Sequence, residues 1–314
     1  MRIVLMSSRQ IGEKILERLV KRGEDMAGVC ALPVSPGVKD RFKESAIKLG
    51  VPYLEARNMS SQEFHDEYIK LKPELNMLAQ LRTILPESVL NYPMYGTIGW
   101  HPSPLPKYAG TNSVIWPIIF GETKTANTIF WTDRRIDAGP ILLQKEVRIS
   151  PDDTSGSLYY DKIIPGAVEA IEEAIDLIEK GIAPRVPQDL SQYSYYSFVT
   201  EKDTIINWAQ PATRIYDLIR GTNPNPGATT NFANRIFKVL DSELRLGFEE
   251  NIVDSVTTAA IKAGGVVDIT SEWIEVIAPD GVILIKAVRF NNSKMAAADF
   301  TQEVGLRIGD RFGS

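Results

Sequence analysis

The sequence predicts an α/β protein of two domains, in which a parallel-rich sheet is followed by a small β-barrel. Three observations predict this fold class. The chain begins with a strand, helix and strand pattern, its 314 residues approach the length of two ordinary domains, and short strand-like runs gather toward its C-terminus. With 44% hydrophobic and 24% charged residues, the composition is that of a globular protein, which excludes collagen-like and disordered classes.

The N-terminal pattern favours a parallel pair of strands. An apolar run at residues 2–6 is followed by Ile11, Ile15 and Leu19 at helical spacing, and then by a second apolar run at residues 26–32. A crossover helix between two strands is typical of a parallel sheet, and the carboxyl ends of such strands usually form the ligand crevice. The loop after the first strand carries neither GxGxxG nor a P-loop pattern. The sequence therefore predicts neither dinucleotide nor P-loop chemistry.

Later apolar runs extend this sheet, and a helix completes the first domain. The runs cover residues 75–81, 97–100 and 127–131. Between Val168 and Ile178, apolar residues recur at the i, i+3, i+4 and i+7 spacing of a helix. Gly181 follows as a helix stop signal.

The C-terminal part has a different pattern. Prolines and a polar cluster at residues 184–204 are typical of a linker on the protein surface. Beyond it, the sequence predicts a helix around residues 212–220 and several short strands. The clearest strand-like runs are residues 265–268, 273–278 and 282–288. We therefore expect a first domain at residues 1–183 and a C-terminal β-barrel at residues 205–314.

Charge and cysteine content limit the function classes. The formal net charge of -5 provides no broad basic face, so nucleic acid is not an expected partner. The only cysteine, Cys30, lies between Val29 and Ala31, a pattern that predicts a buried strand position in a reducing compartment. The N-terminal apolar run is too short for a signal peptide, and no run approaches the ~20 residues of a membrane span. We expect a cytoplasmic protein without membrane contact, and no feature predicts its oligomeric state.

The densest chemical pattern surrounds His101. This histidine follows an apolar run and enters a loop whose three prolines restrict the backbone. On its own, His101 is equally well interpreted as a core histidine bound to a backbone group. Asp137 lies in a second loop after another apolar run, and two strand-end loops of one sheet can bring an imidazole and a carboxylate together. Such a pair is the minimum for proton transfer near neutral pH.

Two other chemistries are disfavoured. One histidine and one carboxylate fall short of the three or four ligands of zinc sites, so no metal is predicted. Ser103 lies two residues from His101, but no GxSxG elbow accompanies it, which disfavours a serine hydrolase.

Two segments carry a resemblance to a known family. His101–Gly110, with the sequence HPSPLPKYAG, and Ile136–Gln144, with the sequence IDAGPILLQ, together resemble the 10-formyltetrahydrofolate-dependent formyltransferase superfamily. The likeness extends over nearly the whole chain and is nearest to the hydrolase domain of 10-formyltetrahydrofolate dehydrogenase. It implies a Rossmann-like formyltransferase domain joined to an OB-like β-barrel. It also implies an enzyme that takes 10-formyltetrahydrofolate as substrate and formyl donor, with His101 and Asp137 as the catalytic pair.

The resemblance further implies where the folate binds. The pterin is expected against the backbone of residues 82–86 and against the loop at residues 135–137. Lys107 flanks the site, where an acceptor channel is also expected. The implied substrate-binding residues are Gly99, Arg82, Ile84, Leu85, Arg135, Ile136, Ser103 and Lys107.

The chain departs from the family in three places. The transferases have an asparagine two residues before the histidine that helps to hold the formyl oxygen, whereas this chain has Gly99. Loss of one such oxyanion donor typically lowers a rate roughly 10²- to 10³-fold. The hydrolase domain also lacks this asparagine. Ala109 stands where many members have an arginine for acceptor or phosphate contacts. Residues 34–43 are short and modestly basic where methionyl-tRNA formyltransferases have a longer basic loop, which disfavours tRNA as acceptor.

The sequence therefore predicts hydrolysis of 10-formyltetrahydrofolate to tetrahydrofolate and formate. Asp137 would orient His101 and help to take a proton from water, and His101 would stabilise the oxyanion and pass a proton to the departing N10. Two alternatives stay open. One is transfer of the formyl group, or of a hydroxymethyl group from 5,10-methylenetetrahydrofolate, to a small amine such as an amino sugar or amino acid. In that case Gly99 would make room for an acceptor group or an ordered water. The other alternative is a folate-binding module that has lost catalysis.

Overall fold

The computed structural model describes residues 1–7, 9–81, 83–247 and 262–313, apart from the side chains of residues 9 and 10. The chain divides into two compact units, each built from segments that are discontinuous in the sequence. The first comprises Met1–Ser113, Thr125–Val147 and Tyr160–Tyr196. The second comprises Val114–Lys124, Arg148–Tyr159 and Ser197–Ser314. Within the described ranges, no helix has the length and apolar character that crossing a bilayer requires.

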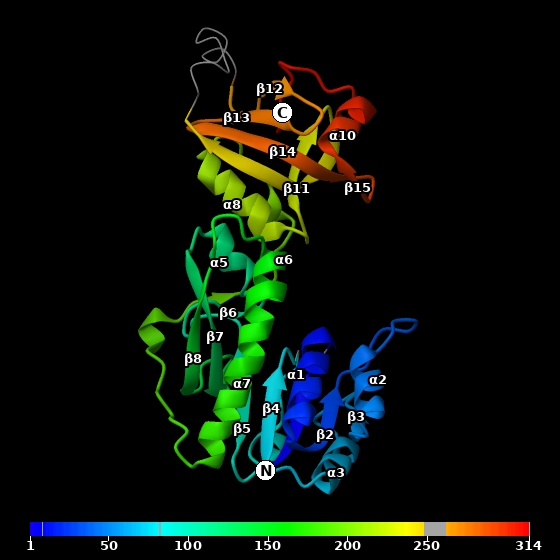
Figure 1. Ribbon diagram of the computed structural model, residues 1–314, viewed down its shortest axis with the longest axis vertical. Helices are drawn as coiled ribbons and strands as arrows, with labels where there is room; N and C mark the ends of the chain where they lie inside the picture. The colour runs from blue at the N-terminus through cyan, green and yellow to red at the C-terminus, as the bar shows by residue number, and fades with distance from the viewer. Residues whose placement is uncertain (8, 82, 248–261, 314) are drawn as a thin grey trace. The chain divides into compact units, whose positions relative to one another are not determined.

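A seven-stranded sheet organises the first unit (Figure 1). In sheet order, its strands are β3 (Tyr53–Glu55), β2 (Asp25–Ala31), β1 (Arg2–Ser7), β4 (Leu75–Ala79), β5 (Thr97–His101), β7 (Lys124–Trp131) and β8 (Ile141–Arg148). The first five strands run parallel, and β7 runs antiparallel to β5. The parallel-rich sheet that the sequence predicts is therefore confirmed.

In the part of the chain that the structure describes, five α-helices complete the first unit. They are α1 (Arg9–Arg22), α2 (Arg41–Lys48), α3 (Gln62–Lys70), α4 (Glu87–Leu90) and α7 (Ile164–Glu179). Helix α3 begins where the Ser61 hydroxyl accepts a hydrogen bond from the backbone N–H of Phe64. Its buried side chains, Phe64 and Tyr68, pack in one apolar cluster with Val4 and Cys30 of the sheet. Burial raises the pKa of the Cys30 thiol to about 12, which confirms the buried strand cysteine that the sequence predicts.

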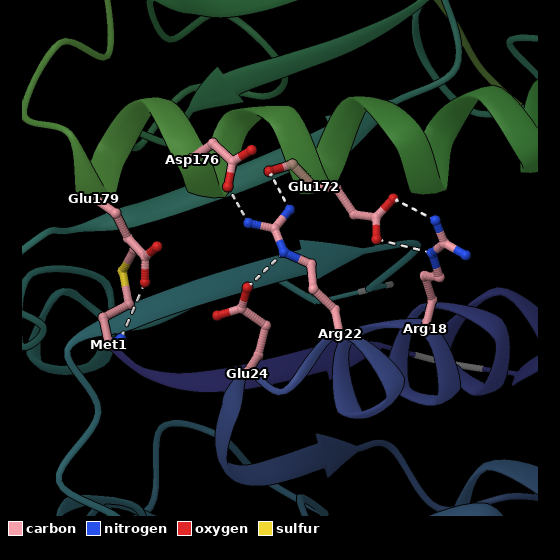
Figure 2. Close-up of polar contacts among 7 residues, drawn as sticks. All are labelled: Met1, Arg18, Arg22, Glu24, Glu172, Asp176 and Glu179. Atoms are coloured by element: carbon pink, nitrogen blue, oxygen red, sulfur yellow. Dashed lines mark hydrogen bonds and ion pairs between the residues drawn. The ribbon is translucent and has the colours of Figure 1, made fainter.

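Ion pairs link α1 to α7 (Figure 2). Arg22 donates to the Glu24 carboxylate at 2.8 Å, to the Glu172 carbonyl at 2.9 Å, and to the Asp176 carboxylate. Arg18 donates to both carboxylate oxygens of Glu172, at 2.8 and 3.2 Å. The side chain of Arg22 is 24% exposed and that of Arg18 is 52% exposed. Because Arg22 is the more buried of the two arginines, we expect its loss to lower the stability of the fold more than the loss of Arg18.

We expect Arg22→Ala to lower the free energy of unfolding by about 1–3 kcal/mol at pH 7, because partly buried charged groups lose their hydrogen-bond partner. Burial raises the pKa of Glu24, and the charge of Arg22 opposes that rise. Because the pKa of Glu24 is higher in the folded state, Glu24 contributes its full stabilisation at pH values below its ordinary pKa. This stabilisation is lost as the pH rises through the folded-state pKa. The loss caused by Arg22→Ala is therefore larger at pH 7 than at pH 4.

Urea unfolding of the wild type, Arg22→Ala and the exposed control Arg18→Ala at both pH values tests this expectation. A smaller loss for Arg22→Ala than for Arg18→Ala at pH 7 would contradict it.

An antiparallel sheet of six strands organises the second unit (Figure 1). Its strands are β10 (Ala228–Phe232), β11 (Arg235–Leu246), β14 (Gly281–Phe290), β13 (Ile274–Ala278), β12 (Val266–Ile269) and β15 (Ser293–Ala296), the last paired with β14. All of these pairings are antiparallel. Among the described residues, this unit has the helices α5 (Ile115–Ile119), α6 (Ser155–Ser157), α8 (Ala212–Thr222) and α10 (Ala297–Val304) and the 3-10 turn η3 (Lys202–Thr204).

Aromatic side chains fill the core of the second unit. Phe237 of β11 lies with its ring centroid 4.5 Å from that of Phe300 on α10 and 5.2 Å from that of Phe312. Ile215 and Ile219 of α8 belong to the same cluster. The helix expected around residues 212–220 and the C-terminal β domain are confirmed.

Several short elements lie between the longer helices and strands. They are the π-helical segment η1 (Leu158–Ile163), the 3-10 turn η2 (Leu190–Gln192), and the two-residue strands β6 (Ala109–Gly110) and β9 (Tyr195–Tyr196). Strands β6 and β9 pair in parallel within the first unit. Part of the segment expected as a linker, residues 184–204, therefore pairs with the loop that follows His101.

Candidate functional site

His101 is the last residue of β5 and is buried, with 6% of its surface exposed. Its Nε2 lies 2.9 Å from the carbonyl oxygen of Tyr108. A carbonyl oxygen only accepts hydrogen bonds, so Nε2 carries a proton. The ring is thus held by a backbone group, as in a core histidine, while its other nitrogen, Nδ1, faces a carboxylate.

Asp137 supplies that carboxylate. Its Oδ2 lies 3.5 Å from Nδ1 of His101 and accepts a hydrogen bond from the backbone N–H of Gly110 at 2.9 Å. The Asp137 side chain is 20% exposed, against 8% for His101. Asp137 has a φ of 49°, in the left-handed region that non-glycine residues seldom adopt and that clusters at functional sites. The structure therefore brings together the two side chains that the sequence singled out.

The route by which Asp137 reaches His101 differs from the one expected. Because β7 is antiparallel to β5, Thr128 pairs with His101, and Trp131 at the end of β7 pairs with Ile98. The loop after β7 therefore starts beside the other end of β5 and turns back to bring Asp137 to His101. Both residues do lie at or after the carboxyl ends of neighbouring strands of one sheet, as expected, but the antiparallel pairing places these two ends at opposite edges of the sheet.

Buried hydrogen bonds fix the proline-rich loop after His101. The Ser103 hydroxyl donates to the Lys107 carbonyl at 2.8 Å, and the Ser103 carbonyl accepts from the Thr128 hydroxyl at 2.6 Å. The Gln144 amide donates to the Leu105 carbonyl at 3.0 Å. Ser103 is fully buried, whereas the Lys107 side chain is exposed. The hydroxyl of Ser103 thus supports the loop that carries the Tyr108 carbonyl.

Phe130 covers Gly99. The two residues pair across β5 and β7, on the side of the sheet that carries His101. A Cβ atom at Gly99 would lie 2.9 Å from Cζ of Phe130 and 3.0 Å from Cγ2 of Thr132. Phe130 is 5% exposed and packs against Leu105. The phenyl ring therefore lies where a side chain at position 99 would begin.

The remaining predicted binding residues differ in exposure. Ile84 is 73% exposed and Ile136 is 49% exposed, whereas Leu85 is buried. Arg135 is exposed, and its guanidinium donates to the Asp133 carboxylate at 2.6 Å and to the Ala138 carbonyl at 3.1 Å. Arg82 lies outside the described residues. The side chains of Ile84 and Ile136 are therefore exposed on the surface.

Sequence reasoning missed several groups that hold the pair. Two are backbone groups, the Tyr108 carbonyl and the Gly110 N–H, which no side-chain pattern marks. Two others are side chains of the segment expected as a linker. Gln188 donates to the carbonyls of Asp137 and Gly139, and the Tyr193 hydroxyl donates to the Ile136 carbonyl at 3.1 Å.

The negative charge of Asp137 affects the pKa of Tyr193. Burial raises the pKa of the Tyr193 phenol, and the negative charge of Asp137 raises it further. The phenol therefore stays protonated at neutral pH and remains a hydrogen-bond donor to the turn that carries Asp137.

Family models match both parts of the chain. A model described as formyl transferase matches residues 1–174, and a model described as formyl transferase, C-terminal domain, matches residues 199–305.

Two kinds of relative have similar sequences. Cytosolic 10-formyltetrahydrofolate dehydrogenase of Mus musculus is 34% identical over 249 residues, which cover 78% of this chain and 28% of that protein. The chain thus spans less than a third of the dehydrogenase. Methionyl-tRNA formyltransferase of Clostridioides difficile is 30% identical over 320 residues, which cover 98% of this chain and 100% of that protein.

Solved structures share the fold. HypX from Aquifex aeolicus, in complex with tetrahydrofolic acid, has a TM-score of 0.68 at 19% identity, covering 99% of this chain and 48% of that one. An N-formyltransferase from Helicobacter canadensis, in complex with folinic acid and dTDP-3-aminofucose, has a TM-score of 0.68 at 17% identity, covering 91% and 98%. At these identities the likeness establishes the fold alone.

Proposed function

Because the chain belongs to the formyl transferase family, we propose that it is a folate-dependent one-carbon enzyme that hydrolyses 10-formyltetrahydrofolate to tetrahydrofolate and formate. The observation that carries this proposal is the environment of Gly99. At that position the chain has no side chain to bind the formyl oxygen, and Phe130 fills the space. The hydrolase-type resemblance and the 34% identity to a 10-formyltetrahydrofolate dehydrogenase support the same activity.

The chemistry follows from the partners of each atom. Oδ2 of Asp137 accepts a hydrogen bond from Gly110 and faces His101. These contacts support Oδ1 as the oxygen that takes a proton from the attacking water. The water oxygen bonds to the formyl carbon, and the carbonyl electron pair moves to the formyl oxygen. Nε2 of His101 is held by Tyr108, so Nδ1 is the nitrogen that exchanges its proton.

Collapse of the tetrahedral intermediate completes the turnover. The proton on Nδ1 of His101 first stabilises the oxyanion and then passes to N10 as the bond between carbon and nitrogen breaks. Asp137 returns the proton it took from water to His101, and formic acid ionises on release. The reaction consumes one water and yields one formate, one proton and one tetrahydrofolate, and it needs no other reactant.

Incubation of the purified protein with 10-formyltetrahydrofolate and no acceptor tests the proposal. We expect formate and tetrahydrofolate in equal amounts, at a rate proportional to the protein concentration. The same incubations with a panel of amino sugars and amino acids should leave the rate unchanged. No formate above the protein-free rate would contradict hydrolysis.

Formyl transfer to an amine is the second candidate. The match to methionyl-tRNA formyltransferase covers 98% of this chain and all of that protein, and this coverage favours transfer. Residues 34–43, which cover most of the connection between β2 and α2 and the start of α2, are short and modestly basic, and this favours a small amine over tRNA as acceptor. A rate that rises and saturates with one amine, accompanied by a formylated amine and no formate, would establish this candidate in place of hydrolysis.

The proposed partners follow from this activity. They are a folate substrate and, for transfer, a small amine, and neither reaction requires a metal. We also propose that the protein acts in the cytoplasm, which the single buried cysteine and the cytosolic relatives support.

A further inference from the structure

Residues 186–196 run beside both loops of the candidate site. At one end, Val186 forms a β-bridge with Ile141, just after the loop that carries Asp137. At the other end, the Ser194 hydroxyl accepts a hydrogen bond from the backbone N–H of Tyr108, whose carbonyl binds His101. This segment therefore contacts the supports of both members of the pair.

Gln188 makes the most direct contact with the Asp137 turn. Its Nε2 lies 2.9 Å from the Asp137 carbonyl and 2.7 Å from the Gly139 carbonyl. Both carbonyls only accept hydrogen bonds, so the amide nitrogen must face them and its two hydrogens are both used. The two bonds join the carbonyls on either side of Ala138, directly after the left-handed Asp137.

The other end of this amide is unpartnered. Oε1 of Gln188 is buried, and it is one of seven buried side-chain polar atoms without a hydrogen-bond partner among the described residues. An unpaired buried acceptor destabilises a fold. The hydrogen bonds that the Gln188 side chain contributes are therefore the two that its amide nitrogen donates to the Asp137 turn.

We propose that Gln188 is a positioning residue that holds the Asp137 turn so that the carboxylate faces His101. Its catalytic meaning rests on the proposed function. Without the two donated bonds, the turn loses its constraint on a backbone conformation that non-glycine residues seldom adopt, and Asp137 moves away from Nδ1 of His101. A displacement of about 1 Å in a catalytic group can lower a rate about 10²-fold.

Gln188→Glu tests the donated hydrogen bonds. The variant keeps the shape of the side chain, but an ionised carboxylate cannot donate to a carbonyl, whereas a protonated carboxyl group has one O–H donor. We expect kcat for formate release to fall about 10- to 100-fold at pH 8. We expect any rise in KM to be smaller than this fall in kcat. We also expect the ratio of variant to wild-type kcat to increase as pH falls, because protonation of the introduced carboxylate restores one O–H donor.

Gln192→Glu is the matched control. Gln192 lies in the same segment and is exposed, and its amide donates a hydrogen bond to the Asp189 carboxylate at 2.9 Å. We expect its kcat to stay within about twofold of wild type at every pH, in line with the small effects of exposed polar contacts. Gln188→Met, which is neutral and of similar length, replaces Gln188→Glu if that variant does not fold, and its kcat should be low at all pH values.

A second readout needs no turnover. The chain has two histidines, His101 and His65 on α3, so the imidazole ¹⁵N NMR signals of these two residues are readily assigned. In Gln188→Glu or Gln188→Met, the His101 signals should move toward those of Asp137→Asn, while the His65 signals stay fixed. If formate release fails in the wild type but the His101 signals move, the proposed hydrolysis is wrong and the positioning role stands. His101 signals and kcat that match wild type in the Gln188 variants would overturn the positioning role.

Discussion

Asp137→Asn is expected to lower the rate of formate release about 10³- to 10⁴-fold, the size of effect seen when an amide replaces a carboxylate beside a catalytic histidine. The amide cannot take the proton of the attacking water, and it cannot stabilise a charged His101 imidazole across the 3.5 Å that separates the two groups. Single-turnover measurements with excess protein isolate the chemical step. The exposed Asp161→Asn variant, in η1 and outside the site, provides a control of equal chemical change.

Binding must be measured alongside the rate. Quenching of tryptophan fluorescence by 5-formyltetrahydrofolate should give a Kd for Asp137→Asn within about tenfold of wild type, since only one side-chain atom changes. Asp137→Asn with wild-type single-turnover rates would show that Asp137 does not take the proton. A loss of folate binding as large as the loss of rate would show that Asp137 acts in binding instead.

The second large effect concerns Gly99 and Phe130. Gly99→Asn is expected to lower the free energy of unfolding by about 1–3 kcal/mol, because its Cβ would lie 2.9 Å from the Phe130 ring and the core must shift. Phe130→Ala is expected to lower it by about 3–5 kcal/mol through the cavity it leaves. The double variant should lose less than the sum, because the asparagine side chain then occupies part of that cavity.

Urea unfolding of the four proteins in this cycle measures the coupling between the two positions. We expect the double variant to be more stable than additivity predicts by at least about 1 kcal/mol, as contacting residues commonly show. Additive losses within about 0.5 kcal/mol would contradict the close approach of Phe130 to Gly99. The double variant would also supply an amide donor near His101, so its effect on formate release measures what the missing asparagine contributes.

The order of strands and helices was largely predictable, but strand direction was not. The apolar runs at residues 2–6 and 26–32 became β1 and β2 because a crossover helix separates them, and this connection imposes a parallel pair. No comparable signal accompanies residues 127–131. An apolar run has the same composition in either direction, so the antiparallel pairing of β7 with β5 follows only from the three-dimensional connection.

The division into units shows a similar limit. The composition changes once, near residue 184, and this change predicts one boundary along the chain. In the structure, Val114–Lys124 and Arg148–Tyr159 group with the C-terminal residues. Contacts with α8 produce this grouping: Phe120 accepts a hydrogen bond from Arg214, and the Ser155 hydroxyl donates to the Asn223 carbonyl. Contacts of this kind leave no trace in local composition.

The candidate site was predictable in its titratable side chains and not in their supports. His101 is one of two histidines in the chain, and Asp137 lies in a loop that contains glycine and proline, so the residue pattern together with the family resemblance marks them. The Tyr108 carbonyl and the Gly110 N–H exist at every residue, so they carry no sequence signal. Gln188 lies in a polar, proline-containing stretch, and surface linkers and segments that hydrogen-bond to a neighbouring loop share that composition.

Oxygen-18 labelling tests the central claim most directly. The protein is incubated with 10-formyltetrahydrofolate in H₂¹⁸O without any amine, and the formate is analysed by mass spectrometry beside a His101→Ala sample. We predict one ¹⁸O atom in each formate released by the wild type, because a solvent water attacks the formyl carbon, and no release above the protein-free rate by His101→Ala. Unchanged release of labelled formate by His101→Ala, or release by the wild type only when an amine is added, would contradict a hydrolase built on His101 and Asp137.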